Sequence, residues 1–226
     1  MNIEKLHEWP LSPGQAVDIQ NQLRSKIKLE PLPAAPKFIA GADVSYTRNS
    51  DDGFAAVVVL TWPQLEMVEL QVARDRVPFP YIPGLLSFRE APILLQAFEK
   101  LHTRPDVILF DGQGIAHPRT MGLATHMGLW LQLPSIGCAK SKLFGTGAMP
   151  DSVRGSWKSL HHDGREIGAI VRTRTGVKPV FVSPGHLITL RESIDLVLHA
   201  ATRYRLPEPL RQAHLQVNSY RMRVEK

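Results

Sequence analysis

Apolar residues recur along the chain at two spacings, which predict helices in some segments and strands in others. Residues 12–30 repeat apolar side chains on one helical face. Ser12, Pro13 and Gln15 at its start match an N-cap, a first-turn proline and a capping-box partner. Three runs with strand character follow, at residues 37–47, 54–62 and 65–77. Short turns separate these runs, so we expect an antiparallel meander.

The rest of the chain alternates between the two patterns. We expect a helix at 88–102, a strand at 105–112, a helix at 120–132, a strand at 134–141 and a hairpin at 166–185. Thr189 and Glu192 form a second capping box that opens a helix through about Tyr204, and a last helical stretch carries His214.

This order of elements predicts one α/β domain over residues 1–226. Its central sheet is mixed, with three antiparallel strands and then parallel strands, and helices flank it. A right-handed crossover after the third strand would bring the fourth strand beside the first. Asp43 in the first strand and Asp111 at the end of the fourth would then face one small volume, since neighbouring strands lie roughly 4.8 Å apart.

Composition narrows the class of protein. The 226 residues are 43% hydrophobic and 21% charged, which are ordinary globular values. The single cysteine, Cys138, fits a reducing compartment, and neither a signal peptide nor an apolar run of membrane-spanning length is evident. We therefore expect a soluble cytoplasmic protein without a membrane partner, and a monomer because there is no heptad seam. The net charge of +6 and pI near 9.6 favour polyanions such as nucleic acid.

The two aspartates are the first candidates for chemistry. An Asp before Gly is commonly a turn residue, so local sequence leaves the role of Asp111 open. Asp43 lies among small and apolar neighbours, where an unpaired ionised carboxylate is costly. Two acids that converge from separate strands repel each other, and a divalent cation removes that repulsion. Mg²⁺ prefers such oxygen ligands and can activate water for hydrolysis of a phosphate ester.

Glu90 is the third acidic candidate. It either closes a capping box with Ser87 or stands free as a metal ligand. Pro92 would lie beyond the first turn of a helix capped at Ser87 and would remove a needed N–H. A helix that begins nearer Arg89 or Glu90 avoids this loss and leaves the Glu90 carboxyl group free.

The segment "FPYIPGLLS" has two interpretations. Pro80 and Pro83 stiffen the chain around Tyr81 and Ile82, either as a loop that packs on the core or as an apolar wedge for a base stack. Gly84 directly after it would let backbone amides approach a ligand closely.

The remaining polar residues are ambiguous when taken singly. Lys140 at a strand end would ordinarily be solvated, and an isolated histidine such as His117 or His214 is more often structural than catalytic. His161 and His162 lie in a polar segment that we expect to be a loop, without spaced partners for zinc. No dinucleotide fingerprint, phosphate-loop lysine or marked nucleophilic serine is present, so we expect no small-molecule organic cofactor.

Four motifs in order, "GADVSY", "PYIPGLLSFRE", "DGQGIAHPR" and "PSIGCAKSKLFG", resemble those of endonuclease V, a deoxyinosine-cleaving DNA repair nuclease. The resemblance runs from about residue 36 through the region of His214. It implies a ribonuclease H-like fold, which agrees with the strand order above. It also implies that DNA containing deoxyinosine is the partner and that the second phosphodiester bond on the 3′ side of the lesion is cut, leaving 3′-hydroxyl and 5′-phosphate ends.

The resemblance also implies roles for individual residues. Asp43 and Asp111 would bind Mg²⁺, or Mn²⁺ as a substitute, and Glu90 would belong to the same acidic centre. Lys140 and His214 would be further catalytic residues. The wedge residues implied to contact DNA are Pro80, Tyr81, Ile82 and Pro83, and those of the hypoxanthine pocket are Gly84, Leu86 and Gly112. We add His117 to these expected DNA contacts.

Two rival functions stay open at this point. A related nuclease could act mainly on inosine-containing RNA or on branched or mismatched strands, because selectivity for the 2′-hydroxyl depends on details of the pocket. A catalytically silent lesion-binding module would keep the wedge without the chemistry. The presence of Asp43, Glu90 and Asp111 together argues against the silent module.

Overall fold

The computed structural model describes residues 1–226 except 2, 4, 11, 49 and 226. The helices are α1 (Pro13–Leu23), the short 3-10 helix η1 (Arg24–Lys26), α2 (Leu86–Glu99), α3 (Leu123–Leu131), α4 (Leu190–Ala200) and α5 (Glu208–Val224). The strands are β1 (Phe38–Tyr46), β2 (Asp52–Thr61), β3 (Met67–Arg76), β4 (Val107–Phe110), β5 (Ser135–Ala139), β6 (Trp157–His162), β7 (Arg165–Val171) and β8 (Val180–His186).

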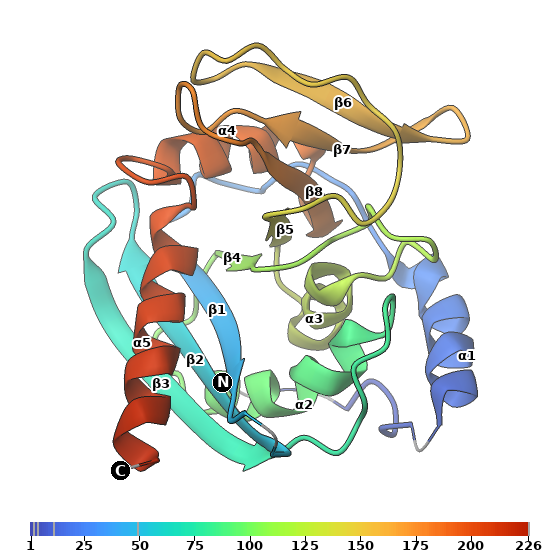
Figure 1. The fold of residues 1–226 in the computed structure, drawn as a ribbon, viewed down its shortest axis with the longest axis vertical. Coiled ribbons are helices and arrows are strands. Elements are labelled where there is room, and N and C mark those ends of the chain that lie inside the picture. The colour runs from blue at the N-terminus through green and yellow to red at the C-terminus, as the bar shows by residue number, and fades with distance from the viewer. Residues whose placement is uncertain (2, 4, 11, 49, 226) are drawn as a thin grey trace.

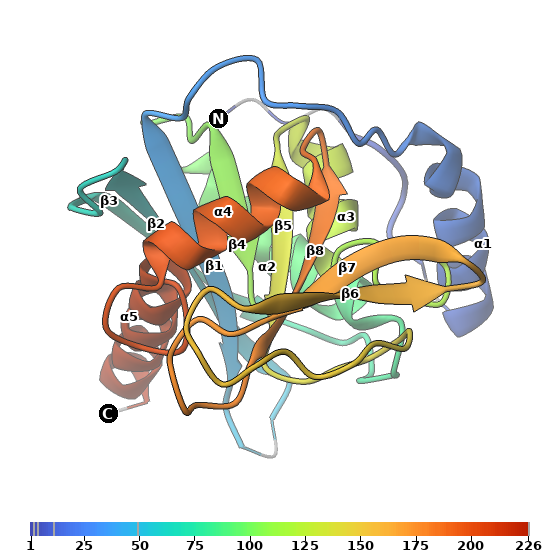
Figure 2. The same cartoon turned by 90° about the horizontal axis from the view of Figure 1, so that it is seen from above.

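Within the described residues the strands form one mixed sheet, in the order β3-β2-β1-β4-β5-β8-β7-β6 (Figures 1 and 2). The meander β1–β2–β3 is antiparallel, while β4 runs parallel to both β1 and β5. The remaining strands, β8, β7 and β6, pair antiparallel beyond β5. The predicted crossover that brings the fourth strand beside the first is therefore confirmed, as is the mixed α/β fold.

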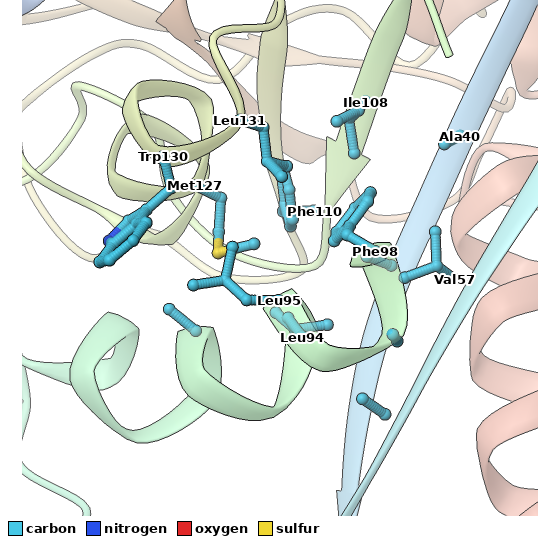
Figure 3. Close-up of a cluster of buried hydrophobic side chains, with 14 of the residues drawn as sticks. Ala40, Val57, Leu94, Leu95, Phe98, Ile108, Phe110, Met127, Trp130 and Leu131 are labelled. Atoms are coloured by element: carbon cyan, nitrogen blue, oxygen red, sulfur yellow. The ribbon is translucent and has the colours of Figure 1, made fainter. Parts of the chain in front are cut away.

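Helices cover both faces of the sheet. Helices α2 and α3 pack on one face, where Phe98 and Phe110 lie at the centre of the largest buried cluster (Figure 3). Helices α4 and α5 pack on the opposite face (Figure 2). Helix α1 begins with the predicted capping box of Ser12 and Gln15, and its buried side contacts the start of α2 and the loop before α3. No helix of the described chain combines the length and the apolar character needed to cross a membrane.

A close approach between β1 and the start of α5 positions one side of the site. A side chain at Gly41 would place its Cβ 2.2 Å from the backbone of Pro209, so only glycine lets α5 lie this near the strand. Helix α5 then runs along β1 and β2 (Figure 1). It thereby brings His214 to Asp43.

Four expectations about the elements were wrong. Helix α2 begins at Leu86 after an N-cap at Leu85, so neither the Ser87 capping box nor a start near Arg89 forms, and Pro92 lies inside the helix. Helix α1 ends at Leu23 rather than continuing towards residue 30. Helix α4 ends at Ala200, short of Tyr204. His161 and His162 lie in β6 instead of a loop, because β6 pairs with the outer edge of β7.

Candidate active site

Asp43 and Asp111 are brought together by the parallel pairing of β1 and β4. The last paired residues of this register are Ala42 and Phe110, and the two aspartates immediately follow them. Both side chains are mostly buried, with 14% of Asp43 and 21% of Asp111 exposed. Burial raises the pKa of Asp43, opposed by its hydrogen bond with His214 and assisted by the negative charge of Asp111.

Glu90 enters the same volume from the first turns of α2. Burial of its carboxyl group, followed by repulsion from Asp43 and Asp111, raises the pKa of Glu90 to about 8. Tyr46 on β1 donates its hydroxyl hydrogen to Oε1 of Glu90 at 3.4 Å. Three acids from β1, α2 and the end of β4 therefore lie in one another's electrostatic field.

Each aspartate is also paired with one basic side chain. Nζ of Lys140, directly after β5, forms an ion pair with Oδ2 of Asp111. Nδ1 of His214 on α5 lies 2.8 Å from Oδ2 of Asp43. The structure thus places all five residues predicted to be catalytic around the ends of β1, β4 and β5.

These carboxylates fit a divalent cation in their chemistry. Their oxygens are the ligands that Mg²⁺ prefers, and the repulsion that raises the pKa of Glu90 is what a bound cation would relieve. Among the described residues, however, no three His, Cys, Asp or Glu side chains are gathered as a ready-made metal cluster. In this conformation Asp43 is instead hydrogen-bonded with His214, and Asp111 forms an ion pair with Lys140.

The segment around Tyr81 is partly packed on the core and partly exposed, so it has features of both the core-packed loop and the wedge. It lies in the loop between β3 and α2. The Tyr81 side chain projects from the surface, with 69% of the residue exposed. Ile82 instead packs with Leu85 and Phe88 beneath the loop. Ile82 thus anchors the segment to the core while the Tyr81 ring stays free to contact another molecule.

A cavity of about 310 Å³ lies beside this loop and contains part of the acidic centre. Gly84, Leu86 and Gly112, for which the family resemblance implies DNA contacts, line it together with His117. Further lining residues are Asp111 and Lys140 together with the following segment, Ser141, Lys142 and Leu143. Asp111 and Lys140, two of the charged residues of the acidic centre, therefore line the same cavity as the glycines.

Gly84 is held in place by its carbonyl oxygen. The residue has φ +82°, a backbone conformation that favours glycine. Its oxygen accepts hydrogen bonds from Nε2 of Gln20 at 3.0 Å, Nε2 of His117 at 3.0 Å and Nη2 of Arg119 at 2.9 Å. The wall of the cavity at the end of the Tyr81 loop is thereby fixed.

His117 is neutral in this arrangement. It is 3% exposed, and burial together with the nearby charge of Arg119 lowers its pKa to about 4. Because Nε2 donates to Gly84, Nδ1 is free to accept from the backbone N–H of Arg119 at 3.1 Å. The structure thus shows His117 bracing the cavity wall from within the protein.

Sequence reasoning missed Tyr46 and Gln20. Tyr46 stands three residues after Asp43 on a strand, so alternation assigns it to the opposite face, and only the position of α2 brings its hydroxyl to Glu90. Gln20 was a polar residue beside the apolar stripe of a helix, and no local signal distinguished it from a solvated side chain. Both roles depend on tertiary packing.

Comparison with known proteins identifies the family. The sequence model of the family Endonuclease V matches residues 21–215. The chain belongs to the endonuclease V family. The endonuclease V of Dehalococcoides mccartyi strain CBDB1 is 48% identical over 215 residues, which cover 95% of this chain and 96% of that protein. The resemblance of the four motifs is thereby confirmed, and the family places this chain among the nucleases.

Solved structures of endonuclease V share the fold. The Bacillus subtilis protein has a TM-score of 0.94 at 32% identity and covers 100% of this chain and 99% of its own. The Ciona intestinalis D234N protein has a TM-score of 0.82 at 26% identity, covering 93% and 97% respectively. That protein was crystallised with a 23mer DNA that contains an inosine followed by a ribo-adenosine. The ribonuclease H-like fold expected from the family is confirmed.

Proposed function

We propose that this endonuclease V recognises deoxyinosine in DNA and hydrolyses the second phosphodiester bond on its 3′ side, leaving 3′-hydroxyl and 5′-phosphate ends. The observation that carries the proposal is the cavity that Gly84 and Gly112 share with Asp111 and Lys140. A nucleotide whose base enters this cavity brings the adjoining backbone to the carboxylates. The inosine-containing DNA bound to the Ciona protein supports this choice of ligand.

Recognition begins at the surface. The basic protein attracts the phosphates of DNA, so binding weakens as salt rises. Tyr81, flanked by Pro80 and Pro83, enters the base stack as the inosine turns out of the helix. The weaker pairing of inosine lowers the cost of this extrusion. Hypoxanthine lacks the exocyclic amine of guanine, so a cavity that fits hypoxanthine closely selects it by excluding that group.

The carboxylates prepare the site for hydrolysis. Asp43, Glu90 and Asp111 would hold Mg²⁺, or Mn²⁺ in its place, which supplies charge stabilisation at the phosphate and activates water. His214 orients the Asp43 carboxylate, and Tyr46 does the same for Glu90. The ammonium group of Lys140 lies beside Asp111, where it stabilises negative charge on a phosphate oxygen at the cavity mouth.

Cleavage of a defined duplex tests the function. An end-labelled duplex with one inosine is incubated with the protein and Mg²⁺, and the nick is mapped to the nucleotide. We expect one nick at the second bond 3′ to inosine, none in the guanine-containing duplex, and none after chelation with EDTA until Mg²⁺ is restored. A nick elsewhere, or turnover that survives exhaustive chelation, contradicts the proposal.

Matched substrates separate the rival functions. The same sequence is supplied as inosine DNA, as inosine RNA and as a branched or mismatched duplex without inosine. We expect inosine DNA to be cut fastest, by a protein that sediments as a monomer and needs no organic cofactor. Faster cleavage of RNA or of the mismatched duplex would assign the protein to that substrate class, and binding without cleavage would make it a lesion-binding module.

A further inference from the structure

Gln20 is a buried polar residue whose contacts all lead to the base cavity. It lies on α1, is 0% exposed, and stands just outside the segment 21–215 that matches the family model. A glutamine amide removed from water is costly unless its donors and its acceptor are all paired. Its hydrogen bonds therefore show what fixes it in place.

Both donors and the acceptor oxygen of the Gln20 amide have partners. Nε2 donates to the carbonyl oxygens of Gly84 at 3.0 Å and Met121 at 3.1 Å. Oε1 accepts from Nε of Arg119. Two carbonyl acceptors and one guanidinium donor define the orientation of the amide, because the reverse orientation would set its oxygen against both carbonyls.

The two carbonyls belong to different walls of the cavity. Gly84 ends the loop that carries Tyr81, whereas Met121 lies between β4 and α3, and both residues line the cavity. Arg119 reinforces the link, since its Nη2 also donates to Gly84 at 2.9 Å. One side chain, 64 residues from Gly84 and 101 from Met121, therefore connects the walls from behind.

We infer that Gln20 is a positioning residue that sets the spacing of the cavity walls and so contributes to selection of hypoxanthine. The inference rests on the proposed function for its substrate. Loss of the amide would free the wall at Gly84 to move relative to Met121, and a looser cavity binds the smaller base less tightly and excludes guanine less well. The carboxylates are untouched by this change.

The test compares Gln20→Met with Gln22→Met. Methionine keeps the shape of Gln20 without its hydrogen bonds, while Gln22 lies on the same helix and is exposed. We expect Gln20→Met to raise KM for the inosine duplex about tenfold with kcat within twofold, as for loss of a buried hydrogen bond. The preference for inosine over guanine should fall, and Gln22→Met should leave both KM and this preference unchanged.

A second readout needs no substrate. Amide hydrogen exchange of the free protein should accelerate at residues 80–86 and 117–122 in Gln20→Met but not in Gln22→Met. Gln20→Glu serves if the methionine variant does not fold, because it keeps the acceptor for Arg119 and loses both donors. Unchanged exchange and unchanged preference would overturn the inference. If the wild type fails to cut inosine DNA, the proposed function falls while exchange still decides the role of Gln20.

Discussion

His214 and Asp43 are hydrogen-bonded at 2.8 Å across 171 positions of the chain. The contact exists because Gly41 admits the start of α5 against β1, which places His214 over the strand. A neighbour of this kind fixes the direction of a carboxylate and affects a metal site indirectly. Asn218, one turn along α5, holds the His214 carbonyl at 2.8 Å and completes the arrangement.

Replacing His214 by Gln should lower kcat more than affinity. The half-exposed ring contributes little to folding, but Asp43 loses its orienting partner. We expect a 10- to 100-fold fall in single-turnover cleavage, the range for a residue that supports a ligand. Binding of inosine DNA should stay within threefold. A variant with wild-type turnover would remove His214 from the catalytic group.

Lys140 and Asp111 should act as one unit. We expect Asp111→Asn and Lys140→Met each to reduce kcat by about 100-fold or more. Lys140→Met removes the positive charge beside the phosphate, and Asp111→Asn removes a carboxylate that would hold the cation. The double variant should be far less impaired than the product of the single effects, because the two groups are in contact. Strictly multiplicative losses in cleavage would show that the pair acts independently.

Tyr81 should contribute to recognition and not to stability. Its ring is exposed, so Tyr81→Ala should leave Tm unchanged while weakening inosine-specific binding by about 1–3 kcal/mol, the usual value for loss of a base stack. Tyr81→Phe keeps the ring and should bind like the wild type. The comparison is made by titrating matched inosine and guanine duplexes; an unchanged preference in Tyr81→Ala would exclude the wedge.

His117 should make stability depend on pH. Its pKa is lowered to about 4 in the folded protein, against an ordinary value near 6.5. Below pH 6.5 His117 therefore binds a proton in the unfolded chain but stays unprotonated in the folded protein. The free energy of unfolding then decreases as the pH falls towards 4. In His117→Gln the slope of unfolding free energy against pH should be shallower by up to about 1.4 kcal/mol per pH unit. Urea titrations between pH 4 and 7.5 measure it, and parallel curves would contradict the assignment.

The meeting of Asp43 and Asp111 was predictable because strand order determines it. The apolar runs that end at Asp111 and surround Asp43 mark buried strands, and the handedness of a crossover makes them neighbours. The edge strand β6 was harder to predict from the sequence. The sequence "WKSLHH" of β6 is half polar because only one side of an outer strand is covered, so its pattern resembles that of a loop.

The prediction of where α2 begins was wrong for a different reason. Pro92 argues locally against a helix that begins at Leu86, yet burial of Phe88, Ala91 and Leu95 against the rest of the protein outweighs one lost hydrogen bond. The bracing of Gly84 by Gln20 and His117 was likewise invisible, since hydrogen bonds between distant segments leave no periodic trace in a sequence.

The late position of α5 in the chain bears on how the enzyme is made. A nascent polypeptide that has left the ribosome through β8 already contains every carboxylate of the site, but the helix that supports Asp43 has still to be synthesised. We expect such a chain to cleave nucleic acid slowly, because Asp43 lacks its orienting partner. Synthesis of α5 would then raise the rate of cleavage.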